Sequence, residues 1–564
     1  MKIKNIFLCS LGLLLVLGSC EKLDQEIRTN LEEHQVYHSY GSQIEYATSV
    51  YTALPTGFTR IGGAMLASAT DEAEYTDETS NVHKFNVGSW VPIDNPDNIW
   101  GTSYNGIRRA NNFLSTTDSI RWGGLILNPT PENQALYMAR LAEINRMSFE
   151  VRFLRAYYYF ELVKRYGGVP LLTESISIDT DVSDIQRATM AQCISFIVSE
   201  CDEAAKVLPP TYIAAELGHA TKGAALALKS RVLLYAASDL YNDPSWAGGY
   251  KNPELISLTG DRKAKWQAAA DAAKAVIDLG VYSLSSNYQN LFKTFNDPEI
   301  IFTRRAGATN TFEKANFPIG YDLGRSGTAP TQDLVDAYEM ANGKAITESG
   351  SGYDAMNPYA LRDPRLGMTV ITNNSTFKGR PVEAFTGGLD GKGVALATRT
   401  GYYLKKYVDE NLNLLLNQTS VHSWHIFRLG EIYLNYAEAL NEASPGHADI
   451  KLYVDKVRQR TGVKQPVLPA GLNQAEMRIR IRNERRVELA FEEHRMWDVR
   501  RWMQGETYLN RPIRAMDITQ TSPGAFTYSV VNLENRVFQP KMYFYPIPQS
   551  ELNIMQNWVQ NPLW

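Results

Sequence analysis

The chain has 564 residues, of which 44% are hydrophobic and 21% are charged, and this ordinary globular usage excludes a disordered, collagen-like or disulfide-rich scaffold. Its 57 basic and 61 acidic residues give a formal charge of −4, so the chain has no basic excess to neutralise a phosphate backbone. We therefore expect no nucleic acid partner. The length allows several domains or one large helical body.

The first twenty residues carry the pattern of an export signal. Lys2 and Lys4 precede an apolar run at 6–16, which is shorter than the roughly 20 residues that a membrane-spanning helix needs. The sequence Leu-Gly-Ser-Cys at 17–20 resembles the lipobox of bacterial lipoprotein precursors. We expect cleavage before Cys20 and a lipid on that cysteine; the alternative is an ordinary secretory signal with an incidental cysteine.

Helical periodicity dominates the rest of the chain. Thr189 and Thr221 are predicted N-caps, and Asn473 with Glu476 forms the pattern of a capping box. Gly167 and Gly280 are predicted to end helices. The apolar stripes lie at 149–160, 194–208, 224–234, 266–277 and 429–440, with a sixth helix starting at 473.

Long polar stretches rich in glycine and proline separate these helices. Loops of such length usually carry function or small irregular elements of their own, so we expect the binding chemistry in them. The stretches lie at 60–100, 241–262, 303–330, 341–400 and 505–550.

Five carboxylates lie within eight residues of the first of these stretches. Such a cluster could bind calcium, accept hydrogen bonds from sugar hydroxyls, or supply the acid–base pair of a glycosidase, although the glycine spacing of an EF-hand is absent. A solvated acidic loop is the simpler interpretation. The residues are Asp71, Glu72, Glu74, Asp77 and Glu78.

The remaining reactive residues favour structural roles. Arginines and acidic residues balance each other at helical spacing over 476–501, which predicts intramolecular ion pairs. Cys193 and Cys201, eight residues apart on one predicted helix, stand too far apart for a disulfide. The sequence contains no nucleophile elbow, phosphate-binding loop or zinc-ligand array. We therefore expect no enzyme, no catalytic residue, no cofactor and no metal.

Several segments, in order along the chain, resemble the SusD/RagB family of nutrient-binding lipoproteins of Bacteroidetes. They are WGTSYNGIRRANN at 100–112, EVRFLRAY and YGGVP within 150–170, RLGEIYLNYAEALN at 428–441, RRVELAFEEHR and WD within 485–498, and YPIPQ and QNP within 545–562.

This resemblance implies a predominantly α-helical fold, in which four tetratricopeptide-like helix pairs form a superhelix and a loop-rich region forms the ligand face. It also implies a lipoprotein signal peptide at 1–19 and a SusD-like body at 20–564. Within the body we expect an N-terminal part at about 20–230 and a C-terminal SusD/RagB part at about 260–564.

The implied function is binding without catalysis. The resemblance implies a lipid-anchored, surface-exposed outer-membrane protein that captures an oligosaccharide or polysaccharide and delivers it to a SusC-like TonB-dependent transporter. The abundant aromatic residues agree with this, because flat rings stack on the apolar faces of sugars. Two alternatives are a peptide- or protein-binding subunit of the same kind of transporter and, more remotely, a lipid-anchored glycosidase.

Two of the long stretches supply the predicted ligand site. We expect Trp90 and Tyr321 to stack on the ligand and Asp71 and Arg325 to form hydrogen bonds with it, whereas helical tyrosines such as Tyr157 should be buried. The alternative is that these rings only hold the loops in place. The predicted set is Asp71, Glu74, Tyr75 and Trp90 from 60–100, with Phe312, Phe317, Tyr321 and Arg325 from 303–330.

Overall fold

The computed structural model describes residues 39–117, 122–176 and 181–564, so the predicted signal peptide and Cys20 lie outside the described residues. Helices predominate, and each sheet in the described part has only two strands. No helix within these ranges is long and apolar enough to cross a bilayer. The fold is therefore predominantly α-helical, as predicted.

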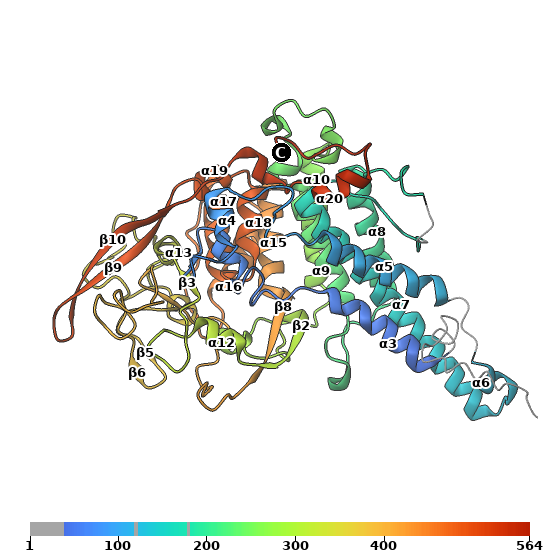
Figure 1. The fold of residues 1–564 in the computed structure, drawn as a ribbon, viewed down its shortest axis with the longest axis horizontal. Helices are drawn as coiled ribbons and strands as arrows, with labels where there is room; N and C mark the ends of the chain where they lie inside the picture. Colours follow the sequence, from blue (N-terminus) through green and yellow to red (C-terminus); the bar gives the residue numbers. More distant parts are fainter. Residues whose placement is uncertain (1–38, 118–121, 177–180) are drawn as a thin grey trace, which may run out of the picture.

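The main helices follow one another in space as they do in the chain (Figure 1). Each of eight helices contacts the next, and taken two by two they make four pairs, while α3 (Tyr40–Val50) packs on the first two. The eight are α5 (Trp100–Thr116), α7 (Pro131–Tyr166), α8 (Met190–Val207), α9 (Lys222–Ala237), α10 (Arg262–Ile277), α15 (Leu429–Ala443), α16 (Ala448–Arg458) and α17 (Gln474–Glu488).

The predicted N-caps and the end at Gly167 are confirmed, whereas α10 ends at Ile277, three residues before the predicted Gly280. The side chain of Thr189 accepts a hydrogen bond from the backbone N–H of Gln192 at the start of α8, and Asn473 forms a capping box with Glu476 at the start of α17. Gly167 ends α7 with a φ of 74°, a conformation that a residue without a Cβ adopts freely. These local signals fix the lengths of the helices.

The loop-rich region lies between α10 and α15 in the chain. It leaves the helical series after α10 and returns through β8 (Ser420–Arg428), which pairs with β2 (Ile300–Thr309) and leads directly into α15. Its other elements are α11 (Tyr288–Leu291), α12 (Thr311–Asn316), β3 (Thr328–Pro330), α13 (Gln332–Ala337), α14 (Arg365–Thr369), β4 (Val370–Ile371), β5 (Thr376–Phe377), β6 (Arg380–Pro381) and β7 (Tyr403–Leu404).

One stretch predicted as loop forms a long hairpin. Strands β9 (Pro512–Ser522) and β10 (Ala525–Asn535) pair antiparallel and project from the body at the left of Figure 1. The outer half of the ribbon is largely exposed, but Phe526, Tyr528 and Val530 of β10 alternate with polar residues, a strand signal that the interpretation of this stretch as loop missed. The remaining short elements are β1 (Ala73–Tyr75), α4 (His83–Val87), α6 (Gly123–Leu127), α18 (His494–Arg501), α19 (Gly505–Leu509) and α20 (Gln549–Ile554).

The arginine-rich segment pairs inside the protein, as predicted. Arg485 lies 3.1 Å and Arg501 2.8 Å from the carboxylate of Asp498. Further in, the carboxylate of Glu488 accepts hydrogen bonds from Arg365, Arg428 and Arg460, and all four side chains are almost fully buried. Cys193 and Cys201 are free and buried, so the prediction of no disulfide between them is confirmed.

Candidate functional site

The two stretches that were predicted to hold the ligand lie side by side. Strand β1 pairs antiparallel with β3, with Tyr75 opposite Thr328, and the N–H of Thr76 donates to the carbonyl of Gly327 at 3.0 Å. This strand pairing brings residues that are some 250 positions apart in the chain together at the β1–β3 edge. The segments meet, but most of their predicted ligand-binding side chains face inward.

Asp71 is buried, which corrects its predicted role as a free hydrogen-bonding partner. Its carboxylate accepts hydrogen bonds from Arg495 at 2.7 and 2.8 Å and from Arg486 at 2.7 Å. The two arginines lie on α17 and α18, so Asp71 fastens the β1 segment to the helical body. Its oxygens are occupied, and the acidic stretch is not a solvated loop at this position.

Trp90 belongs to an aromatic cluster in the core. Its side chain is 0% exposed, and its ring centre lies 4.9 Å from that of Phe85, 5.0 Å from that of Tyr545 and 4.6 Å from that of Trp564. Because the C-terminal tail folds over the ring, Trp90 presents no face to a ligand in this structure. The expectation of an exposed ring here is wrong.

The rings of the second stretch are also buried. Phe317 and Tyr321 both pack edge-on against Phe377, and their ring centres lie 5.2 and 5.1 Å from that of Phe377. The guanidinium of Arg380 lies over the ring of Tyr321, 3.6 Å from its centre. Phe312 packs on Phe58 at 5.0 Å, and Tyr75 is buried beside β3. These rings hold the loops in place, which was the alternative interpretation. Of the eight predicted residues, only Arg325 is exposed.

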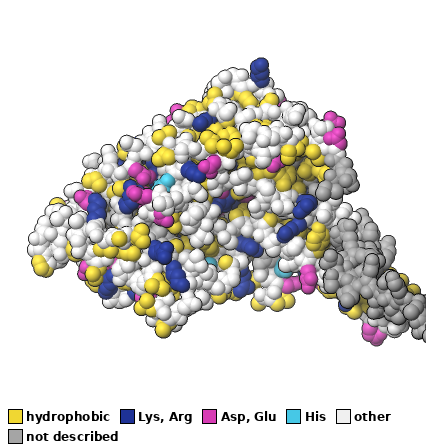
Figure 2. All heavy atoms as spheres, viewed as in Figure 1, with side chains coloured by type: hydrophobic (Ala, Val, Ile, Leu, Met, Phe, Trp, Pro, Cys, Tyr) yellow, Lys and Arg dark blue, Asp and Glu magenta, His cyan; other side chains and the backbone are white. Residues whose placement is uncertain are grey.

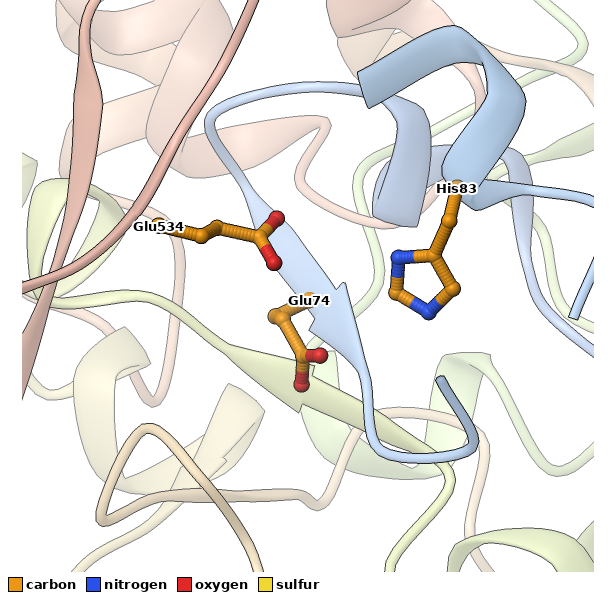
Figure 3. A group of neighbouring side chains, drawn as sticks. All are labelled: Glu74, His83 and Glu534. Atoms are coloured by element: carbon orange, nitrogen blue, oxygen red, sulfur yellow. The ribbon is translucent and has the colours of Figure 1, made fainter. Parts of the chain in front are cut away.

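Glu74 lies in a charged cluster with His83 and Glu534, which come from three different elements (Figure 3). Potential ligand atoms of the three lie within 4.8 Å of one another. The guanidinium of Arg399, however, donates to Glu74 at 2.9 Å and lies 3.8 Å from Glu534. A metal ion would have to displace this cation, so the donor set fits an ion-pair cluster better than a metal centre.

The protonation of Glu74 and His83 also weakens this cluster as a metal centre, because a metal ligand must be deprotonated. Burial raises the pKa of Glu74 to about 7, against the opposing charge of Arg399. Nε2 of His83 lies 3.0 Å from the carbonyl oxygen of Tyr75 and 3.1 Å from that of Asp77, so this nitrogen carries a proton that it donates to the backbone. The imidazole therefore holds the turn after β1.

The carboxylates of this stretch divide into buried and exposed groups. Asp71, Glu72 and Glu74 are buried, whereas Asp77 and Glu78 are exposed. A glycosidase needs two carboxylates that flank the scissile bond, and the three buried ones cannot reach a substrate in this structure. Two hydrogen bonds from Thr79, with smaller contributions from the charges of His83 and Arg325, lower the pKa of Asp77.

A different part of the chain forms an aromatic pocket of about 390 Å³. Trp100 and Tyr104 from α5 line it together with Trp558 from the C-terminal tail, and the ring centre of Trp100 lies 5.1 Å from that of Tyr104 and 6.0 Å from that of Trp558. Asn105 and Arg108 stand at its rim. We call this the Trp100 pocket.

Hydrogen bonds to the backbone hold the two half-buried rings of the Trp100 pocket in place. The hydroxyl of Tyr104 donates to the carbonyl of Pro170 at 2.9 Å, and Nε1 of Trp558 donates to the carbonyl of Ile185 at 2.7 Å. Glu551 also lines the pocket, and burial raises its pKa. Rigid rings beside a few polar groups are typical of a small-molecule site.

The sequence interpretation used the segments around these residues, at 100–112 and within 545–562, only for the family resemblance and not for the ligand site. Trp100, Tyr104 and Arg108 are four residues apart, which places them on one face of α5. This face of α5, with two aromatic residues followed by a charged one, was therefore the sequence signal that could have indicated a ligand pocket. Nothing in the sequence indicated that Trp558 from the far end of the chain would complete the pocket.

The surface shows no single-sign area on the face drawn in Figure 2, where basic and acidic side chains are interspersed. This agrees with the small net charge of the chain. Recognition of a long polyanion needs a continuous basic stripe, which this face does not offer.

Comparison with known proteins gives two family matches. Residues 298–564 match the SusD family, and residues 61–234 match a family described as starch-binding associating with outer membrane. Among curated relatives, SusD-like protein P2 of Formosa agariphila is 26% identical over 424 residues, which cover 71% of this chain and 75% of that protein.

Solved structures share the fold over nearly the whole chain. A SusD-like protein from Bacteroides fragilis is 26% identical with a TM-score of 0.77, and the match covers 94% of this chain and 99% of that one. A SusD-like carbohydrate binding protein from the same organism is 24% identical with a TM-score of 0.75, with 92% and 99% covered.

Proposed function

Since the chain belongs to the SusD family, we propose that it is a lipid-anchored protein of the cell surface that binds an oligosaccharide and delivers it to a SusC-like TonB-dependent transporter. The starch-binding description of the family matched at 61–234 supports a glycan ligand. So does the carbohydrate-binding description of one similar solved structure. The proposed role involves no catalysis.

The Trp100 pocket carries the proposal for the ligand site. The rings of Tyr104 and Trp558 line a cavity of about 390 Å³, which has room for one or two sugar units. Asn105, Arg108 and Glu551 offer the donors and acceptors that sugar hydroxyls require. At the β1–β3 edge, Arg325 with Asp77 and Glu78 remains a proposed second contact surface.

A double substitution tests the site. Replacing Trp558 by leucine and Arg108 by glutamine removes one stacking surface and one hydrogen-bonding group while keeping an apolar side chain in the pocket. We expect the affinity for malto-oligosaccharides to fall at least tenfold, about 1.4 kcal/mol, in isothermal titration calorimetry. The melting temperature should change little, and Lys251→Gln, at an exposed lysine outside the pocket, serves as the control.

Unchanged affinity in the double variant would contradict the Trp100 pocket as the glycan site. Titration with oligopeptides separates the peptide-binding alternative, which one observation favours: Ile176, Val182, Ile185 and Met555 also line the pocket and would accept an apolar side chain. Peptide binding with no glycan binding would replace our proposal by that alternative.

The anchor and the transporter form the second half of the proposal. The sequence up to Cys20 resembles a lipobox, and acidic residues follow the cysteine. We expect palmitate labelling of the wild-type protein and recovery of a much larger TonB-dependent transporter from detergent-solubilised outer membranes. Cys20→Ala should lose the label. Labelling that survives this substitution would refute the anchor, and recovery of the protein alone would refute the partner.

A further inference from the structure

A second pocket, of about 500 Å³, opens between helices α10, α15 and α17. It shares no residue with the Trp100 pocket. Its lining is polar and holds four basic side chains, three acidic ones and the rings of Trp266 and Trp502. We call it the Arg482 pocket.

The three acidic groups of the Arg482 pocket already have partners. The carboxylate of Glu438 accepts hydrogen bonds from Arg501 at 2.5 and 2.7 Å and from Nε1 of Trp502 at 2.7 Å. Glu442 pairs with Arg478 through two bonds of 2.6 Å. Asp239 pairs with Arg262. The charges of these three groups are therefore balanced within the protein.

Two cations of the pocket lack such balance. Arg482 donates no hydrogen bond to any of the described residues, and its Nη2 lies 3.8 Å from Asp239, which is beyond hydrogen-bonding distance. Its guanidinium lies over the ring of Trp502 at 4.6 Å, and its Nε is buried without an acceptor. Lys263, at the start of α10, is exposed and has no ion-pair partner within the described ranges.

A guanidinium in a pocket whose one ion pair, with Asp239 at 3.8 Å, is too long for a hydrogen bond is suited to one kind of ligand. Its planar fork of N–H donors matches the two oxygens of a carboxylate, and hydrogen bonds to an ionised partner are about twice as strong as neutral ones. Burial lowers the pKa of Arg482; the charges of Glu438 and Asp239 oppose this shift, and those of Arg501 and Arg478 add to it. The negative charge of a bound anion would stabilise the charged form of Arg482 against its burial and against the repulsion from Arg501 and Arg478.

We propose that the Arg482 pocket binds the carboxylate of an acidic sugar, held by Arg482 and Lys263. The cavity volume suits one or two sugar units, and the largely buried rings of Trp502 and Trp266 form part of its wall. A second saccharide site of this kind goes beyond the proposed function, because it selects for charge and lies outside the Trp100 pocket.

Calorimetry on the mature chain tests this site with three probes: digalacturonate, the neutral disaccharide galactobiose, and sodium sulfate. We expect digalacturonate to bind at least tenfold more tightly than either of the other two. Arg482→Gln should weaken its binding at least tenfold and Lys263→Gln about threefold. Arg482→Lys, which keeps the charge but loses the fork, should lie between wild type and the glutamine variant.

The control is Lys251→Gln, which removes an exposed lysine outside the pocket and should leave the affinity unchanged. Since Arg482 makes no hydrogen bond with any residue that the structure describes, its glutamine variant should fold normally, and Lys263→Gln gives an independent reading on an exposed residue. Equal binding of sulfate and digalacturonate would overturn the sugar claim in favour of an adventitious ion only. Undiminished binding by Arg482→Gln, or no binding of digalacturonate by wild type, would overturn the site.

Discussion

Replacing Arg428 by methionine is expected to destabilise the fold by about 3–5 kcal/mol, because it leaves buried carboxylates without their donor. The guanidinium of Arg428 lies 2.7 Å from Glu299, 2.8 Å from Glu488 and 2.6 Å from Glu492. All four side chains are no more than 2% exposed. Methionine fills similar space, so the loss reports the charge and the hydrogen bonds and not a cavity.

Urea denaturation measures this loss as a shift of the unfolding midpoint at an unchanged slope. The control is Lys206→Met, which breaks the exposed pair with Glu203 and should cost less than 1 kcal/mol. An Arg428→Met protein within 1 kcal/mol of wild type would contradict the view that these carboxylates stay charged and buried. It would also mean that the arginine of the RLGE sequence at 428–431 is not needed to neutralise these buried carboxylates.

The pH dependence of the same network has a definite sign. Burial opposes ionisation of Glu488, but the charges of Arg460, Arg428 and Arg365 prevail and hold its pKa below the ordinary range. A carboxyl whose pKa is depressed in the folded state stabilises the fold above its unfolded pKa and loses that contribution as the pH falls through the folded one. The penalty of Arg428→Met should therefore be full at neutral pH and shrink in acid.

The sequence predicted the elements whose signals are local. The cap at Thr189, the capping box at Asn473 and the stop at Gly167 lie within a few residues of the helix ends that they define. Helical spacing of apolar residues then places the core-facing stripe of each helix. These features do not depend on where the rest of the chain lies, and this is why the helical fold could be predicted.

The burial of the predicted site residues depended on distant segments. Asp71 is held by Arg486 and Arg495, which follow it by 415 and 424 residues. Its charge and its polar neighbours predict exposure, and only the tertiary fold supplies two arginines to pair with it. The same holds for Tyr321, whose ring is covered by Phe377 and Arg380. An aromatic residue in a polar stretch is therefore weak evidence for an exposed ring.

Replacing Trp90 by alanine should destabilise the protein by about 3–5 kcal/mol, the usual cost of emptying a large aromatic site in a core. The ring is fully buried among Phe85 of α4 and Tyr545 and Trp564 of the C-terminal tail. Its removal therefore leaves a cavity between α4 and the tail. Thermal unfolding measures the loss. Trp90→Phe keeps a ring in the cluster and leaves a smaller cavity in place of the larger indole with its unpaired Nε1, so it should cost less.

Glycan affinity distinguishes this role from the stacking role that the sequence suggested. If Trp90 acts through the core, the alanine variant should bind whichever glycan the wild type binds with unchanged affinity at a temperature where it is still folded, while its melting temperature falls. A stacking ring would give the reverse: affinity would drop at least tenfold and the melting temperature would stay. The second result would require the tail at Trp564 to move off Trp90 when a ligand binds, because the two ring centres stand 4.6 Å apart.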